Sequence, residues 1–291
     1  MIRSPGQKAF SAVNTLLMIL LMLITAYPLY FVLIASFSDP TELMLNPGAL
    51  LVPLQPLTLR AYEMVLGNPL IVSGYSNTLF IMVVGVVINL IMTITCAYTL
   101  SIRDLLLKNP VTFFIIFTMY FSGGLIPGYL NIRDLGLYDS LWALILPGAL
   151  STTNMIIMKT AFQAVPESLP ESAKLDGASH FTLLLRIMTP LCVPTIAVMV
   201  LYYGVGHWNS WFSASIYLKT NSKFPLQLVM RNILNSVAVA EMAGSDMDET
   251  ARLVDLIKYA LIIIATVPIL ALYPFLQKYF VKGIMIGAIK G

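Results

Sequence analysis

The chain alternates between long apolar stretches and short polar segments. Six of the apolar stretches contain no Asp, Glu, Lys or Arg, and each is long enough to cross about 30 Å of hydrocarbon as a helix. The runs are continuous, without the apolar and polar alternation of a membrane β-barrel. The pattern therefore predicts an all-α integral membrane protein with six transmembrane helices. The predicted spans lie within residues 9–38, 64–102, 109–132, 140–158, 187–218 and 259–277.

The third apolar stretch contains two kinds of helix-breaking residue. Gly123 and Gly124 are followed by Pro127, and both residue types favour a break or an end of the helix. Paired glycines are equally common where helices pack closely. We expect the helix to break or end here, with close packing as the alternative.

Composition and charge agree with a membrane protein. Hydrophobic residues make up 58% of the 291 residues and charged residues only 11%, whereas charged residues approach a quarter of an ordinary soluble domain. The net charge of +3 is dispersed along the predicted membrane edges, which disfavours nucleic-acid binding. Lys and Arg are more frequent in the segments that lie inside if the amino terminus is cytoplasmic. The sequence thus predicts a multi-pass plasma-membrane protein with both termini in the cytoplasm.

Motifs for catalysis or for nucleotide binding are missing from the sequence. It has no G-x-x-x-x-G-K-[ST], H-E-x-x-H or G-x-S-x-G. His180 and His207 have no carboxylate or cysteine at metal-ligand spacing, and Cys96 and Cys192 suit buried hydrophobic positions. We expect His207 to be a hydrogen-bonded structural residue beside Trp208, since proton-coupled transporters usually carry several intramembrane ionisable groups. The chain is predicted to be no enzyme and to bind no cofactor or metal.

A polar loop, ESLPESAKLDGASHFTLLLRIMTP, separates two of the predicted spans. Ser168 and Glu171 have the spacing of a capping box, Gly177 is placed to end the first helix, and Ser179 is placed to begin a second one. An interfacial helix usually carries several Lys or Arg and bulky apolar anchors. Because this loop is rich in small and acidic residues, it suits docking into a groove of another protein.

The loop resembles the EAA loop of ABC importer permeases, in which E-A-A and a glycine are followed by I-x-L-P. Glu171, Ser172, Ala173 and Gly177 match the first half, with Ser172 in place of alanine, and Ile187 and Pro190 match the second. Further segments resemble the carbohydrate-uptake, maltose-permease-like branch of that family. These segments are the region from Asn77 to the Ala97–Leu100 tetrapeptide, Ile126–Pro147 and the closing Lys278–Gly291.

This resemblance implies a type I importer fold in a single permease domain over residues 1–291. Its core is expected at about 70–280, and its coupling loop, 166–190, lies between the fourth and fifth helices. The implied partners are a second homologous permease, two cytoplasmic ATPase subunits that bind the ATP, an extracytoplasmic solute-binding protein and an oligosaccharide substrate. Glu171 and Asp176 are the candidates for contact with the ATPase, with helix capping and solvation as the alternative, and Gly177 is favoured as a backbone requirement. The residues implied in coupling to the ATPase are Glu171, Ser172, Ala173, Asp176, Gly177 and Pro190.

A sugar path needs aromatic, amide or hydroxyl groups that face the pore. Interfacial aromatic belts and interhelical hydrogen bonds are the alternative explanation for each candidate. The outer segment, roughly 215–258, is expected to meet the binding protein, with a helix start at Ser245 or Asp246. The candidates for the path are Asn77, Asn89, Tyr120, Asn154, Tyr202, Tyr203, Trp208, Asn209 and Trp211.

Three other functions compete with an oligosaccharide importer. A secondary transporter would carry an ion-coupling carboxylate or inverted three-helix repeats, and neither is visible. An ABC permease for a non-sugar solute is distinguished by its carboxy-terminal and outer-loop segments, which in this chain resemble those of carbohydrate permeases. An intramembrane enzyme would need paired catalytic groups, which the spans lack.

Overall fold

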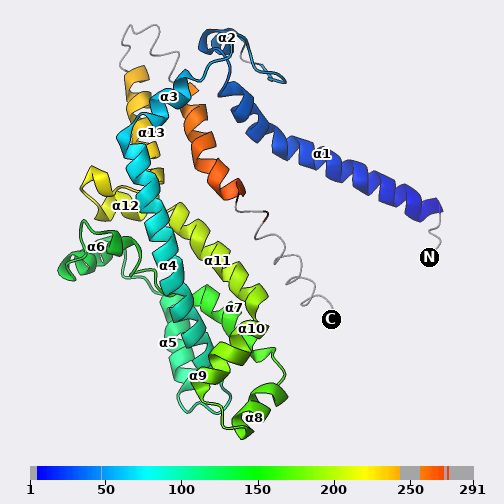
Figure 1. Ribbon diagram of the computed structural model, residues 1–291, viewed down its shortest axis with the longest axis vertical. Coiled ribbons are helices and arrows are strands. Elements are labelled where there is room, and N and C mark those ends of the chain that lie inside the picture. Colours follow the sequence, from blue (N-terminus) through cyan, green and yellow to red (C-terminus); the bar gives the residue numbers. More distant parts are fainter. Residues whose placement is uncertain (1–4, 47, 243–255, 272–273, 275–291) are drawn as a thin grey trace. The chain divides into compact units, whose positions relative to one another are not determined.

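The computed structural model describes residues 5–46, 48–242, 256–271 and 274, and its regular elements in these ranges are all helical. They form two compact units. One unit is built from Met1–Pro69 and Asn232–Pro268, and the other from Leu70–Arg231 and Ile269–Gly291. Figure 1 labels the helices in chain order.

The first unit contains the long helix α1, Pro5–Ala35, whose side chains are apolar and mostly exposed, as expected for a surface facing lipid. Ile34 and Ala35, at its end, pack with Leu50. Phe31 contacts Tyr259 edge-on, with ring centroids 6.0 Å apart, and Tyr259 belongs to the apolar helix Leu256–Ala271. Two short helices follow α1, namely α2, Pro40–Leu45, and α3, Arg60–Leu66.

The second unit is organised along α4, Pro69–Ser101, an unbroken helix of 33 residues. Its only proline is the first residue, where the missing N–H removes no helical hydrogen bond. At 1.5 Å per residue this helix is about 50 Å long. Figure 1 shows α8 and α9 at one end of α4. The other helices of this unit are α5, Lys108–Tyr120; α6, Leu125–Asp134; α7, Thr152–Gln163; α8, Ser168–Leu175; α9, His180–Leu183; α10, Thr189–Leu191; α11, Val193–Trp208; and α12, Trp211–Tyr217.

The third apolar stretch is broken at the predicted glycines, and it is not one straight helix. Helix α5 ends at Tyr120 and α6 begins at Leu125, with a bend of 116° between them. Gly124 lies at the break with φ of 91°, a conformation that side chains other than glycine rarely adopt. Pro127 follows in the first turn of α6, where a proline costs no hydrogen bond.

The fourth and fifth stretches differ from the predicted single helices. Within 140–158, residues Leu141–Leu144 form a 3-10 turn and the α-helix begins only at Thr152. Pro147 and Gly148 lie between these elements, and both favour irregular backbone. Within 187–218 the helix breaks at Cys192 with a bend of 84°. It then ends at Trp208, before the short helix α12.

Two helices in the described part of the chain are each long and apolar enough to span a membrane, Gly6–Ala35 and Pro69–Ser101. The count rises to four if each bent pair is one span. The sixth predicted stretch, 259–277, overlaps Leu256–Ala271. The count of six stays a prediction, as does the division into one domain with a core at 70–280.

Two sequence predictions fall outside the described residues. The helix start at Ser245 or Asp246 lies within 243–255, and the closing segment Lys278–Gly291 lies within 275–291.

Candidate functional site

The predicted coupling loop folds as two helices joined by a turn, α8 and α9. The first helix begins differently from the prediction, because Ser168 is already its first helical residue. Glu167 occupies the N-cap with helical φ and ψ, and no side chain caps the helix. The predicted capping box is therefore wrong. Glu167 instead forms an ion pair with Arg103, which follows the end of α4, at 2.6 Å.

The end of α8 agrees with the prediction. Gly177 has φ of 79°, and its amide donates to the carbonyl of Lys174 at 3.0 Å. The amide of Ala178 reaches back to the carbonyl of Ala173 at 2.9 Å. These two bonds form a Schellman motif, which satisfies the last carbonyls of a helix. A Cβ added to Gly177 would meet nothing within 4 Å, so the glycine is required by its backbone conformation and not by lack of space.

The second helix also begins as predicted. The hydroxyl of Ser179 accepts a hydrogen bond from the amide of Thr182 at 3.2 Å, which caps α9. The helix continues as a π-helical turn, Leu184–Met188, and then as α10, which contains Pro190. Pro190 has no amide hydrogen to donate to the preceding turn, and a π-helical turn is one way of accommodating such a gap.

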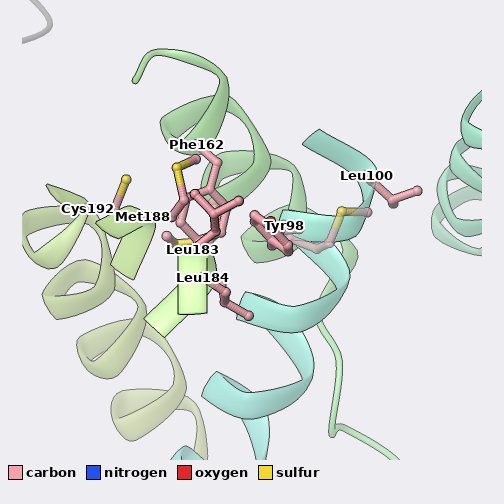
Figure 2. Close-up of a cluster of buried hydrophobic side chains, with 10 residues drawn as sticks. Tyr98, Leu100, Phe162, Leu183, Leu184, Met188 and Cys192 are labelled. Carbon is pink, nitrogen blue, oxygen red and sulfur yellow. The ribbon is translucent and has the colours of Figure 1, made fainter. Parts of the chain in front are cut away.

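A buried apolar cluster lies behind the coupling loop and connects it to the rest of this unit. In Figure 2 the side chains of Tyr98, Phe162, Leu183 and Met188 converge, while Leu100 points away from them. Ala173 of α8 packs against this cluster. The cluster joins α9 and the π-helical turn to α4 and α7, so the coupling loop rests on two other helices of this unit.

Polar contacts tie both helices of the loop to α4. The hydroxyl of Tyr98 lies 3.0 Å from Nδ1 of His180, the first residue of α9. The ion pair of Arg103 with Glu167 ties the start of α8 to the same end of α4. A cavity of about 300 Å³ lies between these contacts, with Ser101, Gln163 and Lys174 in its wall.

The loop exposes a mixed acidic and apolar surface. Leu175 is 89% exposed and Phe181 is 70% exposed. Such apolar residues on a polar loop are a signal for docking, which sequence reasoning passed over. Glu171, Ser172, Asp176, Gly177 and Pro190 are also exposed, and Ala173 is half-buried.

Several of the predicted substrate-path residues join elements of this unit by hydrogen bonds. Asn77 donates to the carbonyls of Ser222 at 2.8 Å and Phe224 at 3.1 Å. Tyr203 lies with its hydroxyl 2.6 Å from that of Thr93. Asn77 and Tyr203 thus take part in hydrogen bonds between segments of this unit, and their place in the substrate path stays a prediction.

Asn89 and His207 form a second buried link between α4 and α11. Asn89 donates through Nδ2 to the carbonyl of Gly148 at 2.6 Å, so its Oδ1 faces Nε2 of His207 at 2.7 Å. Because Oδ1 can only accept, Nε2 of His207 carries the proton. His207 packs so closely on Gly85 of α4 that a Cβ at this position would overlap the imidazole ring. His207 is thus a hydrogen-bonded packing residue, as expected.

The remaining candidates have varied surroundings. Tyr120, at the break after α5, is 85% exposed, and Tyr202 is 50% exposed. Trp208 is buried and contacts Tyr75 edge-on. Asn154 is buried in α7. Asn209 follows the end of α11, and its side-chain amide donates to the carbonyl of Val205, while Trp211 begins α12. Trp208, Asn209 and Trp211 are neighbours in the sequence, at the turn between α11 and α12.

Asp139 organises the segment after α12, and sequence reasoning missed it. Its carboxylate accepts hydrogen bonds from the amides of Lys219 and Thr220, at 2.9 and 3.0 Å, and from the Thr220 hydroxyl at 2.6 Å. Lys223 forms an ion pair with it at 3.0 Å. The hydrogen bonds from Thr220, followed by that from Lys219, hold the pKa of Asp139 well below its usual range. In the structure Asp139 has φ of 55°. In the sequence it is a single aspartate, which gives no signal for such a role.

Comparison with known proteins identifies the family. Residues 71–286 match the family described as "Binding-protein-dependent transport system inner membrane component". The chain belongs to this permease family. The permease is 42% identical to Protein LplC of Bacillus subtilis (strain 168) over 268 residues, which cover 92% of this chain and 90% of the relative.

Two further comparisons concern named carbohydrates. A polygalacturonan/rhamnogalacturonan transport system permease protein, YtcP, from Bacillus subtilis (strain 168) is 38% identical over 278 residues, covering 94% of the permease and 96% of the relative. A crystal structure of a bacterial ABC transporter involved in the import of the acidic polysaccharide alginate is similar with a TM-score of 0.85 and 29% identity. That match covers 96% of the permease and 99% of the solved chain.

These findings confirm the predicted family and the all-helical type I importer fold. A permease of this family is a membrane transport component, and it works with another permease, an ATPase and a solute-binding protein. Similarity to these proteins assigns no role to an individual side chain, so the coupling and substrate-path residues stay predictions.

Proposed function

We propose that this permease forms half of the translocation pore of an ATP-driven importer for oligosaccharides, and specifically for chains that contain uronate sugars. The transport mechanism is supported by the contacts of the coupling loop, α8 and α9, with the end of α4 through Tyr98 and Arg103. The substrate class rests on two similarities, to a permease for polygalacturonan/rhamnogalacturonan and to an importer of the acidic polysaccharide alginate.

The proposed assembly contains this permease, a second homologous permease, two cytoplasmic ATPase subunits that hydrolyse the ATP and an extracytoplasmic binding protein. The permease lies in the plasma membrane with both termini in the cytoplasm, so the coupling loop faces the ATPase. Its own chain needs no cofactor.

In this proposal the coupling loop docks into a groove of the ATPase. Leu175 and Phe181 supply exposed apolar contacts, and Glu171 and Asp176 supply negative charge. Ala173 supports the helix from behind, and Gly177 sets the turn. Ser172 presents a small side chain to the groove, and Pro190 fixes the start of the following helix. Closure of the ATPases on ATP then moves α8 and α9, and the cluster of Figure 2 transmits the movement to α4.

The opposite end of α4 contacts the outer part of the same unit. The hydroxyl of Thr78 accepts from the amide of Leu226 at 2.9 Å, and Asn77 holds the segment of Ser222 and Phe224. Helix α4 therefore connects the ATPase side to the segment proposed to meet the binding protein. A rigid helix of this length can carry a displacement between two such sites.

The test is uptake of a labelled oligogalacturonate into proteoliposomes that hold the complete importer. We expect uptake that requires both internal ATP and the external binding protein. Uptake driven by an ion gradient without ATP would instead indicate a secondary transporter. ATP-dependent uptake of a non-sugar solute, with none of the oligosaccharide, would contradict the substrate class.

A further inference from the structure

Arg231 of the permease lies over the indole ring of Trp211. Its guanidinium carbon is 3.6 Å from the ring centroid, well within the range of a cation–π contact. Trp211 begins α12, and Arg231 lies in α13, Leu226–Met242. The two residues belong to the same compact unit.

The ring beneath Arg231 is held in place by buried neighbours. Trp211 packs against an apolar cluster that includes Ile81 of α4, Ala214 of α12 and Leu228 of α13. A ring supported in this way restricts the arginine side chain that lies on it. An arginine that is ordered before it binds loses less conformational freedom on binding, which favours affinity.

The charge of Arg231 is not neutralised within the described residues. Two other basic residues of this region are paired: Arg133 with Asp134 at 3.3 Å, and Lys223 with Asp139 at 3.0 Å. Arg231 is exposed, and its described contact is with the ring of Trp211. Contact through the central carbon leaves the N–H groups of the guanidinium available. Their planar fork matches the two oxygens of a carboxylate.

The position of this pair suits a substrate that arrives from outside. Helix α13 begins against the amino-terminal part of α4, where Leu226 bonds to Thr78. The coupling loop contacts the other end of α4, at Tyr98. Arg231 and Trp211 thus belong to the side where the proposed binding protein delivers its sugar.

We infer that Arg231, held on the ring of Trp211, is a recognition site for the carboxylate of a uronate sugar in the permease. This inference rests on the proposed function and deepens it. The cation and the aromatic ring together would distinguish an acidic oligosaccharide from a neutral one of the same length, since a neutral sugar leaves the fork without a partner.

The experiment compares uptake of an oligogalacturonate and of its methyl ester by the complete importer in proteoliposomes. The variants are Arg231→Gln, Arg231→Lys and Trp211→Phe. Lys219→Gln is the matched control, because Lys219 is an exposed cation of the same region without an aromatic platform. Recovery of the assembled complex and its basal ATP hydrolysis check that each variant is folded.

We expect Arg231→Gln to raise the KM for the acid by about tenfold or more, as for the loss of a charge-assisted pair of hydrogen bonds. Arg231→Lys and Trp211→Phe should raise it less, and Lys219→Gln should leave it within about twofold. Uptake of the methyl ester, where wild type supports it, should not change in Arg231→Gln.

An unchanged KM in Arg231→Gln would overturn the inference, as would a rise matched by Lys219→Gln or an equal loss for the ester. Loss of ATPase stimulation at saturating acid would assign Arg231 to docking of the binding protein and would also overturn it. If wild type imports neither sugar, the proposed function fails. In that case the affinity of the purified importer for the oligogalacturonate is measured by titration, in wild type and in Arg231→Gln. Weaker binding by Arg231→Gln would support the role of Arg231, and equal binding would overturn it.

Discussion

The hydroxyl of Tyr98 lies 3.0 Å from Nδ1 of His180, although 82 positions separate the two residues in the chain. Tyr98 lies in the last turns of α4, and His180 begins the second helix of the coupling loop. Tyr98 also contacts Phe162 of α7 edge-on, with centroids 6.2 Å apart. One side chain therefore connects the coupling loop to two helices of the unit.

Tyr98→Phe should weaken coupling while preserving assembly. The change removes one hydrogen bond, worth about 1 kcal/mol, and keeps the ring in the apolar cluster. We expect fewer sugar molecules transported per ATP hydrolysed. Tyr30→Phe is the control, because it also removes one hydroxyl hydrogen bond, to the carbonyl of Leu51 at 2.7 Å, but lies in the first unit and outside the coupling loop. An equal ratio of transport to hydrolysis in wild type and Tyr98→Phe would contradict this role.

Substitutions of Gly177 should follow the order set by its backbone. At φ of 79° asparagine is better tolerated than alanine, because its side chain can bond locally. We expect sugar-stimulated ATP hydrolysis to fall in the order Gly, Asn, Ala, with about 1 kcal/mol of strain in Gly177→Ala. The reverse order of the two variants, with the larger asparagine worse, would indicate a direct contact with the ATPase.

Gly85→Ala should destabilise the permease. The added Cβ would overlap the imidazole of His207, which is fixed by Asn89. Overpacking of this kind costs about 1–3 kcal/mol, so the Tm of the purified permease should fall by several degrees. Gly204→Ala in α11 is the matched control, since its Cβ would meet nothing within 4 Å. Equal Tm values for the two variants would contradict the packing.

Asp139 should make stability depend on pH in the acid range. Its pKa is lowered in the folded state, so its stabilising effect is fully present above the unfolded pKa, about 3.9. The effect is lost as the pH falls towards the folded pKa. Asp139→Asn should lower Tm at neutral pH, and the difference from wild type should shrink between about pH 4 and 2. A difference that is independent of pH would contradict this; Asp134→Asn, at an exposed pair, should have little effect.

The sequence pattern predicted the helical class and the parts of the coupling loop that depend on local chemistry. Gly177 and Ser179 act as their residue types suggest, through positive φ and a capping hydroxyl. Ser168 does not act as the predicted N-cap, because the helix starts one residue earlier and Glu167 forms an ion pair with Arg103. That partner is distant in sequence, so local spacing could not reveal it.

The absence of charge was a good guide to apolar segments but a poor guide to helix ends. The charge-free stretch 140–158 predicted one span, but Pro147 and Gly148 interrupt the helix there. The predicted span also ended before Lys159, whereas α7 includes this residue. The pairs of Asn89 with His207 and of Arg231 with Trp211 depend on how helices pack. Their residue types alone allow many partners, so the pairs emerge only from the fold.

The most direct test of coupling is sugar-stimulated ATP hydrolysis by the reconstituted importer with Leu175→Glu and Leu106→Glu. Both leucines are almost fully exposed, at 89% and 95%, but only Leu175 lies in the coupling loop. We expect Leu175→Glu to abolish stimulation or assembly with the ATPase, and Leu106→Glu to keep both. Full stimulation with Leu175→Glu would contradict docking of α8 into the ATPase.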